Sequence, residues 1–224
     1  LRAIQAWICL VRMDLPMGYE HALAAVDVLR PGSYWWAKAI GICFYSFFMV
    51  GRFEHIERLI RSFMGPRPEA DAGIAFLEAG NALCIFLTNV GQRHAAAATI
   101  ARMTEVAGNV DLQDHGALLM ADSYRLLKLE PDLQAAIHRA QQGLALVINN
   151  GESLIQVQAI FYLGVARLAA GEVAEGERIL REGLAFAMRI REDFGTVVTH
   201  RHLARSLAGD PDPDRQPDAP QARG

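Results

Sequence analysis

The chain has 224 residues, of which 52% are hydrophobic and only 8% aromatic, so small apolar side chains supply most of the buried surface, as in closely packed helical proteins. Lys and Arg total 22 against 25 for Asp and Glu, and this net charge of -3 lacks the basic excess of a nucleic-acid-binding protein. The longest apolar run, residues 39–50, is too short to span a membrane. We therefore expect neither a nucleic-acid partner nor a membrane partner.

The positions of the lysines and cysteines argue against several further kinds of binding site. Lys38 and Lys128 are the only lysines, and no phosphate-binding loop motif surrounds either of them. Cys9, Cys43 and Cys84 are too few and too widely spaced for a disulfide framework or a zinc site, which favours a reducing cytoplasm. The first residues, LRAIQAWICLVRMD, read as the middle of a helix, so we expect no signal peptide and a longer parent protein.

In chain order, five segments repeat one pattern, a short turn followed by an amphipathic helix: residues 17–29, 51–63, 91–103, 130–144 and 171–184. Each is preceded by a more apolar helix that ends just before the turn. Five glycine- and proline-rich breaks separate the pairs: Pro31-Gly32, Gly65 to Pro68, Gly108-Asn109, Asn149 to Gly151, and Gly195.

The repeating unit is therefore helix, tight turn, helix, with a period averaging about 40 residues. No segment alternates apolar and polar residues as a strand does, so the predicted fold is all-α. Helix pairs at this period stack into a solenoid. We predict a repeat domain over residues 1–208, with units at about 1–31, 32–68, 69–109, 110–151 and 152–195 and a partial unit at 196–208. Residues 209–224, rich in proline and aspartate, are expected to be disordered.

The units resemble tetratricopeptide (TPR) repeats, most clearly in LGVARLAAGEVAEGERILREGLAFA, residues 163–187. Leu163-Gly164 matches the family's Leu-Gly pair, Gly171 lies at the turn, and Gly176 lies on the second helix. Small residues at 164 and 176 suit a close helix crossing, and glycine at 171 relieves a strained turn. The resemblance implies a right-handed α-α superhelix of about five to six helix pairs.

Longer, Ala- and Arg-rich repeats of this kind are similar to the helical regions C-terminal to bacterial serine/threonine kinases and to large regulatory ATPases. LRPGSYWWAKAIG, residues 29–41, resembles a linker between repeats in such kinase-associated regions. This resemblance implies a cytoplasmic regulatory module whose catalytic domain lies outside the chain.

No residue constellation indicates catalysis. His21, His55 and His94 recur at one position of the second helices, which favours solvated or capping roles, and no zinc-binding pattern is present. The cysteines also occupy equivalent positions, which favours core packing. An aromatic cluster, with Trp35 and Trp36 near its start, suits either a core or a ligand cage. We expect no catalytic residue, no metal and no cofactor.

In TPR stacks the first helix of each pair lines a concave groove. Placing that pattern on this chain predicts ten partner-binding residues: Lys38, Tyr45, Glu78, Asn81, Thr88, Asn89, His115, Asp122, Arg125 and Gln158. An ordinary solvated face remains open as the alternative interpretation of these residues.

The sequence thus predicts a non-catalytic protein–protein interaction module that binds protein or peptide segments, including neighbouring domains of the same polypeptide. The alternative is a small-molecule-sensing repeat domain of a transcriptional or signalling regulator, which the aromatic cluster motivates.

Overall fold

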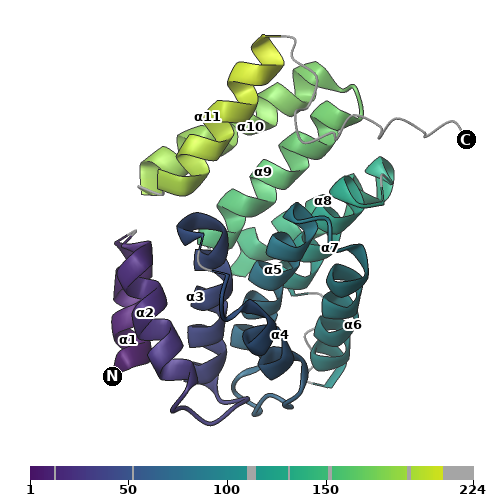
Figure 1. The fold of residues 1–224 in the computed structure, drawn as a ribbon. Helices are drawn as coiled ribbons and strands as arrows, with labels where there is room; N and C mark the ends of the chain where they lie inside the picture. Colours follow the sequence, from purple (N-terminus) through teal and green to yellow (C-terminus); the bar gives the residue numbers. More distant parts are fainter. Residues whose placement is uncertain are drawn as a thin grey trace, which may run out of the picture. The chain divides into compact units, whose positions relative to one another are not determined.

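The computed structural model describes residues 1–12, 14–51, 53–109, 115–130, 132–150, 153–190 and 193–208 (Figure 1). Within these ranges the chain forms eleven α-helices and no strand, which confirms the all-α prediction. The chain divides into two compact units, Leu1–Leu146 and Val147–Gly224, and the division falls inside a helix. The predicted disordered tail, 209–224, lies outside the described residues.

Unit 1 contains seven complete helices and most of an eighth: α1 (Arg2–Val11), α2 (Leu15–Val26), α3 (Tyr34–Val50), α4 (Ile56–Met64), α5 (Gly73–Asn89), α6 (Arg93–Asn109), α7 (Gly116–Lys128) and α8 (Leu133–Asn150). The odd-numbered helices contact one another in sequence, α1 with α3, α3 with α5, and α5 with α7. The even-numbered helices pack beside them, α2 against α1 and α3, and α6 against α5 and α7. Each odd helix is therefore an inner element of this unit.

Three turns between paired helices share one backbone conformation. Gly51, Gly91 and Gly171 have φ of 71°, 72° and 81°, the left-handed region in which a β-carbon is strained. The prediction for Gly171 is confirmed. Gly51 and Gly91 are 40 residues apart and Gly171 follows after twice that interval, so the turns themselves keep a constant period.

Two longer loops hold neighbouring helix pairs together. Gly32, with φ of 89°, lies against the backbone carbonyl of Arg67, where a β-carbon has no room. The amide of Glu69 donates a hydrogen bond to the Gly32 carbonyl at 2.8 Å, and the Glu69 carboxylate lies 3.1 Å from the Arg30 guanidinium. The predicted breaks at Pro31-Gly32 and Gly65–Pro68 are thus loops that contact each other.

Helix α2 begins earlier than the repeat pattern indicates. The Asp14 side chain caps it by accepting from the Met17 amide at 3.4 Å, and Pro16 lies in the first turn, where no amide donor is required. Gly18, at the start of the predicted turn-and-helix segment 17–29, is helical, and a β-carbon built on it would lie 3.3 Å from Cβ of Cys9. The cap and the proline together move the start of α2 to Leu15.

Aromatic rings fill the centre of unit 1. Phe63 of α4 stacks on Phe76 of α5 with ring centroids 4.2 Å apart, and Phe44 of α3 meets Phe63 edge-on at 5.6 Å. Phe47 and Trp36 of α3 are also fully buried. This core joins α3, α4 and α5 into one packed layer.

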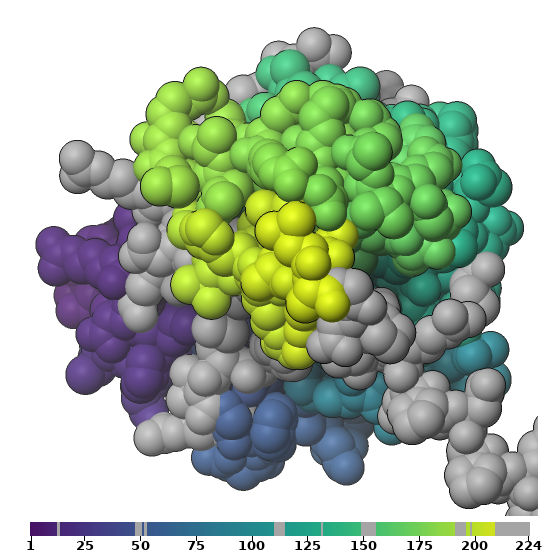
Figure 2. Space-filling view, turned by 90° about the horizontal axis from the view of Figure 1, so that it is seen from above, coloured from purple at the N-terminus to yellow at the C-terminus, as the bar shows by residue number. Residues whose placement is uncertain are grey.

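Unit 2 contains α9 (Ser153–Ala169), α10 (Val173–Ile190) and α11 (Asp193–Leu207). A β-carbon built at Gly164 would lie 2.7 Å from Leu180, and one at Gly176 would lie 2.8 Å from Leu168, so glycine permits the close crossing of α9 and α10 that the sequence predicts. Figure 2 shows α11, in yellow, against the green surface of α9 and α10, which it contacts.

Gly195 lies inside α11 and does not separate two units, contrary to our expectation. It occupies the first turn of the helix, where a glycine costs at most about 1 kcal/mol relative to alanine. Across the described residues, no helix is long and apolar enough to cross a membrane.

Candidate functional site

Helices α3 and α5 are apolar on nearly every side and carry one charged residue each. These residues, Lys38 and Glu78, form an ion pair with each other across the two helices. Their side chains are only 14% and 32% exposed. Because a charge in such surroundings is costly without a partner, the pair fixes α3 and α5 relative to each other.

The exposed surface of α5 is limited to one narrow stripe. Every residue of this helix is buried except five that recur at helical spacing: Ile74, Glu78, Ala82, Ile85 and Asn89. We call this set the α5 stripe. Because inner helices are covered on their other sides, a partner can reach α5 only along this line.

Helix α3 repeats the arrangement. Among its described side chains the half-buried ones at the same spacing are Tyr34, Lys38, Gly41 and Tyr45, which we call the α3 stripe. Lys38 pairs with Glu78, a β-carbon built at Gly41 would lie 3.2 Å from Cα of Ala79, and Phe47 contacts Phe86 at 5.8 Å. These contacts advance together along both helices, so α3 and α5 run in the same direction. Their stripes form one surface, the α3–α5 face.

Aromatic rings surround the lysine at one end of this face. The Lys38 ammonium lies 5.0 Å from the centroid of the Trp7 ring of α1 and 5.7 Å from that of Tyr34. Cation–π attraction to two rings and the Glu78 carboxylate hold the ammonium in place. Trp7 therefore extends the α3–α5 face onto α1.

A neutral bridge lies at the other end. Asn89 accepts a hydrogen bond from the Tyr124 hydroxyl of α7 at 2.7 Å, and its own amide donates to the Ile85 carbonyl at 2.9 Å. Asn89 is nevertheless exposed. Its side chain thus links α5 to α7 at the surface.

Three of the ten predicted residues lie away from the exposed surface. Asn81 and Thr88 are on the buried side of α5, at 5% and 4% exposure. His115 is also buried and caps α7, because its Nδ1 accepts from the Ala117 amide at 3.2 Å. A polar side chain on an apolar helix does not by itself identify the solvent side.

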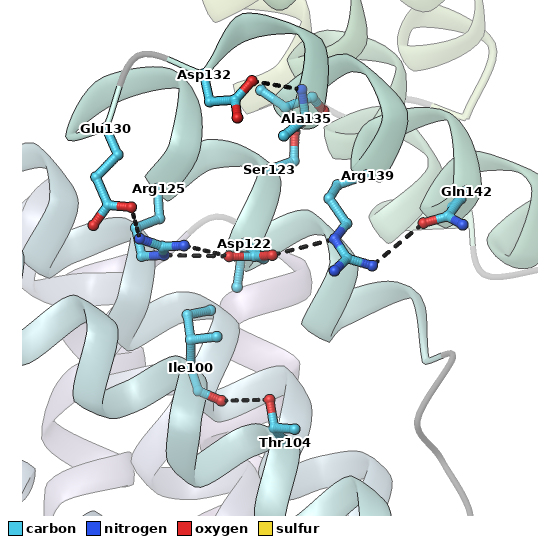
Figure 3. A network of polar contacts seen from close by, with 12 residues as sticks. Ile100, Thr104, Asp122, Ser123, Arg125, Glu130, Asp132, Ala135, Arg139 and Gln142 are labelled. Carbon is cyan, nitrogen blue, oxygen red and sulfur yellow. Dashed lines mark hydrogen bonds and ion pairs between the residues drawn. The ribbon is translucent and has the colours of Figure 1, made fainter.

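Asp122 and Arg125 belong to an ion network between α7, the following loop and α8 (Figure 3). Asp122 accepts from Arg125 at 2.9 Å and lies 3.3 Å from Arg139 of α8, while Arg125 also pairs with Glu130 at 2.8 Å. Burial lowers the pKa of Arg125, but its bonds to Glu130 and Asp122 outweigh that effect and raise it overall. The buried Ser123 hydroxyl donates to the Ala136 carbonyl at 2.8 Å. These contacts join α7 to α8.

The remaining predicted residue, Gln158, is half-buried on α9 and belongs to unit 2. Four of the other nine, Lys38, Tyr45, Glu78 and Asn89, share the α3–α5 face. Sequence reasoning missed Trp7 and the apolar or small members of the stripes, which are Tyr34, Gly41, Ile74, Ala82 and Ile85. Counting turns from Lys38 and Glu78 finds the stripe members, because each stripe follows helical spacing from its single charge, but it does not find Trp7, which lies on α1.

Part of the aromatic cluster, which comprises Tyr34, Trp35, Trp36, Phe44, Tyr45, Phe47 and Phe48, is core. Trp36, Phe44 and Phe47 are fully buried, whereas Trp35 is 41% exposed. The core interpretation is therefore confirmed for these three rings, and it removes them from any ligand cage.

Two of the three cysteines are buried, as expected, and Cys9 is half-buried. Burial raises the pKa of the Cys43 thiol well above its ordinary value, and it raises that of Cys84 to about 12. The Cys84 thiol donates to the Ala121 carbonyl at 3.6 Å, which links α5 to α7. Both thiols are held in the unreactive protonated form.

Nowhere in the described ranges do three His, Cys, Asp or Glu side chains gather in a way that could hold a metal ion. The predicted histidines are dispersed: His21 contacts Arg2 at 2.9 Å, His55 precedes α4, and His94 is exposed on α6. No protein-family model matches the chain, and no curated protein is similar to it in sequence.

Proposed function

We propose that the chain is a non-catalytic helical-repeat module of the TPR type, which binds a protein segment on the α3–α5 face. The observation that carries the proposal is that two neighbouring inner helices, each buried on nearly all sides, leave one continuous line of accessible side chains. The ion pair of Lys38 with Glu78, which fixes the two helices to each other, also provides a charged group on this line.

The repeat assignment is supported by the recurrence of contacts at one period. Lys38 and Glu78 are 40 residues apart, the same interval as Gly51 and Gly91. Inner helices that contact one another, with outer helices beside them, are the arrangement expected of a right-handed α-α superhelix. In such a superhelix the α3–α5 face belongs to the concave groove.

The chemistry of this face suits a peptide or helix. The α5 stripe extends over fifteen residue steps, or about 22 Å of helix. Its middle is apolar and small, with Gly41, Ala82 and Ile85, and charged and amide groups lie at the two ends. Glu78 and Asn89 are eleven residues apart, or about 16 Å along the helix, so a segment with apolar side chains at its centre and polar groups at this separation would match the distribution.

We place this module in a cytoplasmic bacterial signalling polypeptide, beside a serine/threonine kinase or a regulatory ATPase. The TPR resemblance of residues 163–187 and the linker resemblance of residues 29–41 support this context. Partners then include both other proteins and neighbouring domains of the same polypeptide.

A display selection of random peptides on the full chain tests the proposal. Selected peptides should lose about tenfold in affinity when Glu78→Ala and Asn89→Ala are combined, because a tenfold loss corresponds to about 1.4 kcal/mol of lost contacts. The matched control combines Glu57→Ala and Arg61→Ala on the exposed side of outer helix α4, and it should leave affinity unchanged.

Circular dichroism of both variants verifies that helicity is retained. Failure to select any peptide would contradict the proposal. Equal binding by the wild type and the α5 variant would also contradict it, because the peptides would then bind elsewhere.

A further inference from the structure

Asn89 is the last residue of α5, and its side-chain amide is held from two sides. Its Nδ2 donates to the Ile85 carbonyl at 2.9 Å, and its Oδ1 accepts from the Tyr124 hydroxyl of α7 at 2.7 Å. Because the Ile85 carbonyl can only accept, Nδ2 has to face it, and the hydroxyl then donates to Oδ1. The two bonds together define which end of the amide is nitrogen and which is oxygen.

The tyrosine hydroxyl is itself delivered by a fixed helix. Tyr124 is only 8% exposed. Three residues earlier on α7, the Ala121 carbonyl accepts from the Cys84 thiol of α5 at 3.6 Å. The next residue, Arg125, belongs to the ion network that joins α7 to α8 (Figure 3). The hydroxyl therefore reaches a defined point at the end of the α5 stripe.

Part of the Asn89 amide remains available. A primary amide offers two N–H donors and two lone pairs on its oxygen, and the two bonds above use one of each. Asn89 is exposed and makes no further hydrogen bond within the described residues. Accepting at Oδ1 also draws electron density toward the oxygen, which makes the remaining N–H a better donor and the remaining lone pair a weaker acceptor.

We propose that Tyr124 is a positioning residue for the α3–α5 face: it fixes the Asn89 amide so that the second N–H donates to an oxygen acceptor of the bound segment. This proposal rests on the function proposed above and specifies the chemistry of the segment at this end of the face. It also makes α7 part of the binding site without requiring that the buried Tyr124 touch the partner.

NMR of the side-chain amides in the full chain tests the positioning without any ligand. The Asn89 signals are identified by their loss in Asn89→Ala. Tyr124→Phe removes only the hydroxyl, so solvent exchange of the Asn89 side-chain protons should become faster by about fivefold, the factor that one hydrogen bond contributes to an equilibrium. Tyr162→Phe, at a buried tyrosine of α9 in unit 2, is the matched control and should leave these signals unchanged.

Binding of the tightest peptide from the display selection separates positioning from a general structural role. Tyr124→Phe should weaken this binding by about fivefold in the wild-type chain. It should have no further effect in the Asn89→Ala chain, because Tyr124 acts through Asn89. A purely structural role would weaken binding equally in both chains. Tyr162→Phe should bind the peptide like the wild type.

Asn89→Asp tests the direction of the hydrogen bond to the partner. The carboxylate has the same shape as the amide but no N–H to donate, and it places a negative charge against an acceptor oxygen. This variant should therefore bind the peptide no more tightly than Asn89→Ala. Binding as tight as that of the wild type would mean that the partner donates, and it would overturn the proposal.

Two further results would overturn it: unchanged proton exchange at Asn89 in Tyr124→Phe, or an undiminished effect of Tyr124→Phe in the Asn89→Ala chain. Circular dichroism of each variant verifies that helicity is retained. A selection that yields no peptide contradicts the proposed function, and the exchange measurement on the free chain still tests the role of Tyr124.

Discussion

Helices α5 and α10 each belong to a pair of helices joined by a short turn, but their charged residues find partners in different places. Helix α5 has one charged residue, Glu78, which pairs with a neighbouring inner helix. Helix α10 carries a row of charges that pair along its own exposed side, such as Arg178 with Glu175 at 2.7 Å and with Glu182 at 2.5 Å. A charge on an inner helix therefore constrains tertiary structure, whereas charges on an outer helix maintain a solvated surface.

The largest effect should follow from emptying the core beside α5. Phe76→Ala removes a fully buried ring that stacks on Phe63, and it should lower the free energy of unfolding by about 3 to 5 kcal/mol. Urea denaturation followed by circular dichroism measures this loss. A loss below about 1 kcal/mol would mean that α5 is not an inner helix.

A smaller loss should follow from filling the crossing of α9 and α10. Gly164→Leu forces a side chain against Leu180, and overpacking of this kind costs about 1 to 3 kcal/mol. Hydrogen exchange should show faster opening of α9 and α10 amides. Gly171→Ala provides a contrasting control: it meets no atom within 4 Å and strains only the backbone.

The ion pair of the α3–α5 face tests how inner helices hold their charges. Lys38→Met leaves the half-buried Glu78 carboxylate without its ammonium and should cost about 1 to 3 kcal/mol. Adding Glu78→Gln should restore part of this loss, since no unpaired charge remains. A thermodynamic cycle of urea midpoints measures the coupling; simple additivity would show that the two side chains do not interact.

The buried thiols should respond to pH with a defined sign. Because the pKa of Cys84 rises from 9.0 to about 12 on folding, the folded state favours the protonated thiol. Its contribution to stability is fully present below pH 9 and is lost as the pH rises from 9 toward 12. The urea midpoint should fall over this range, and less steeply in Cys84→Ala. In the folded chain at neutral pH, a thiol reagent should modify Cys9 much faster than Cys43 or Cys84.

The smallest effect should follow from removing a charge of α10. Arg178→Ala breaks the surface pairs with Glu175 and Glu182, yet it should leave the urea midpoint unchanged within error, because exposed ion pairs add little to stability. A clear destabilisation would indicate that the outer helices, too, depend on their charges, and it would remove the contrast with α5.

The features of the fold that were predictable from sequence depend on local chemistry. Gly171 at a left-handed turn and Gly164 at a crossing were recognisable because only one residue type suits each place. The start of α2 was not, because the Asp14 cap and Pro16 act outside the repeat pattern. Gly195 predicted a break between two units, but the first turn of a helix tolerates glycine, and α11 includes this residue.

The candidate site was harder to predict than the fold. Asn81 and Asn89 are both amides on α5, and only the packing of neighbouring helices decides that the first is buried and the second exposed. The positions of Gly41 and Ala82 on the accessible side could not be predicted, because a small residue occurs on the buried and on the exposed side of an apolar helix. Which side of an apolar helix faces solvent is a property of its neighbours, and the helix's own sequence records it weakly.

The constant interval between the left-handed turns has a consequence for chain length. Gly51 and Gly91 are one period apart, and Gly171 lies two periods further on, so the turn glycines share a single register. A segment of one whole period added or removed between them leaves these three turns their glycines and each inner helix an inner neighbour. A change in length that moves one of these turns off its glycine puts a β-carbon in the left-handed region. Duplication of whole units avoids this cost, because the added segment brings its own turn residues with it.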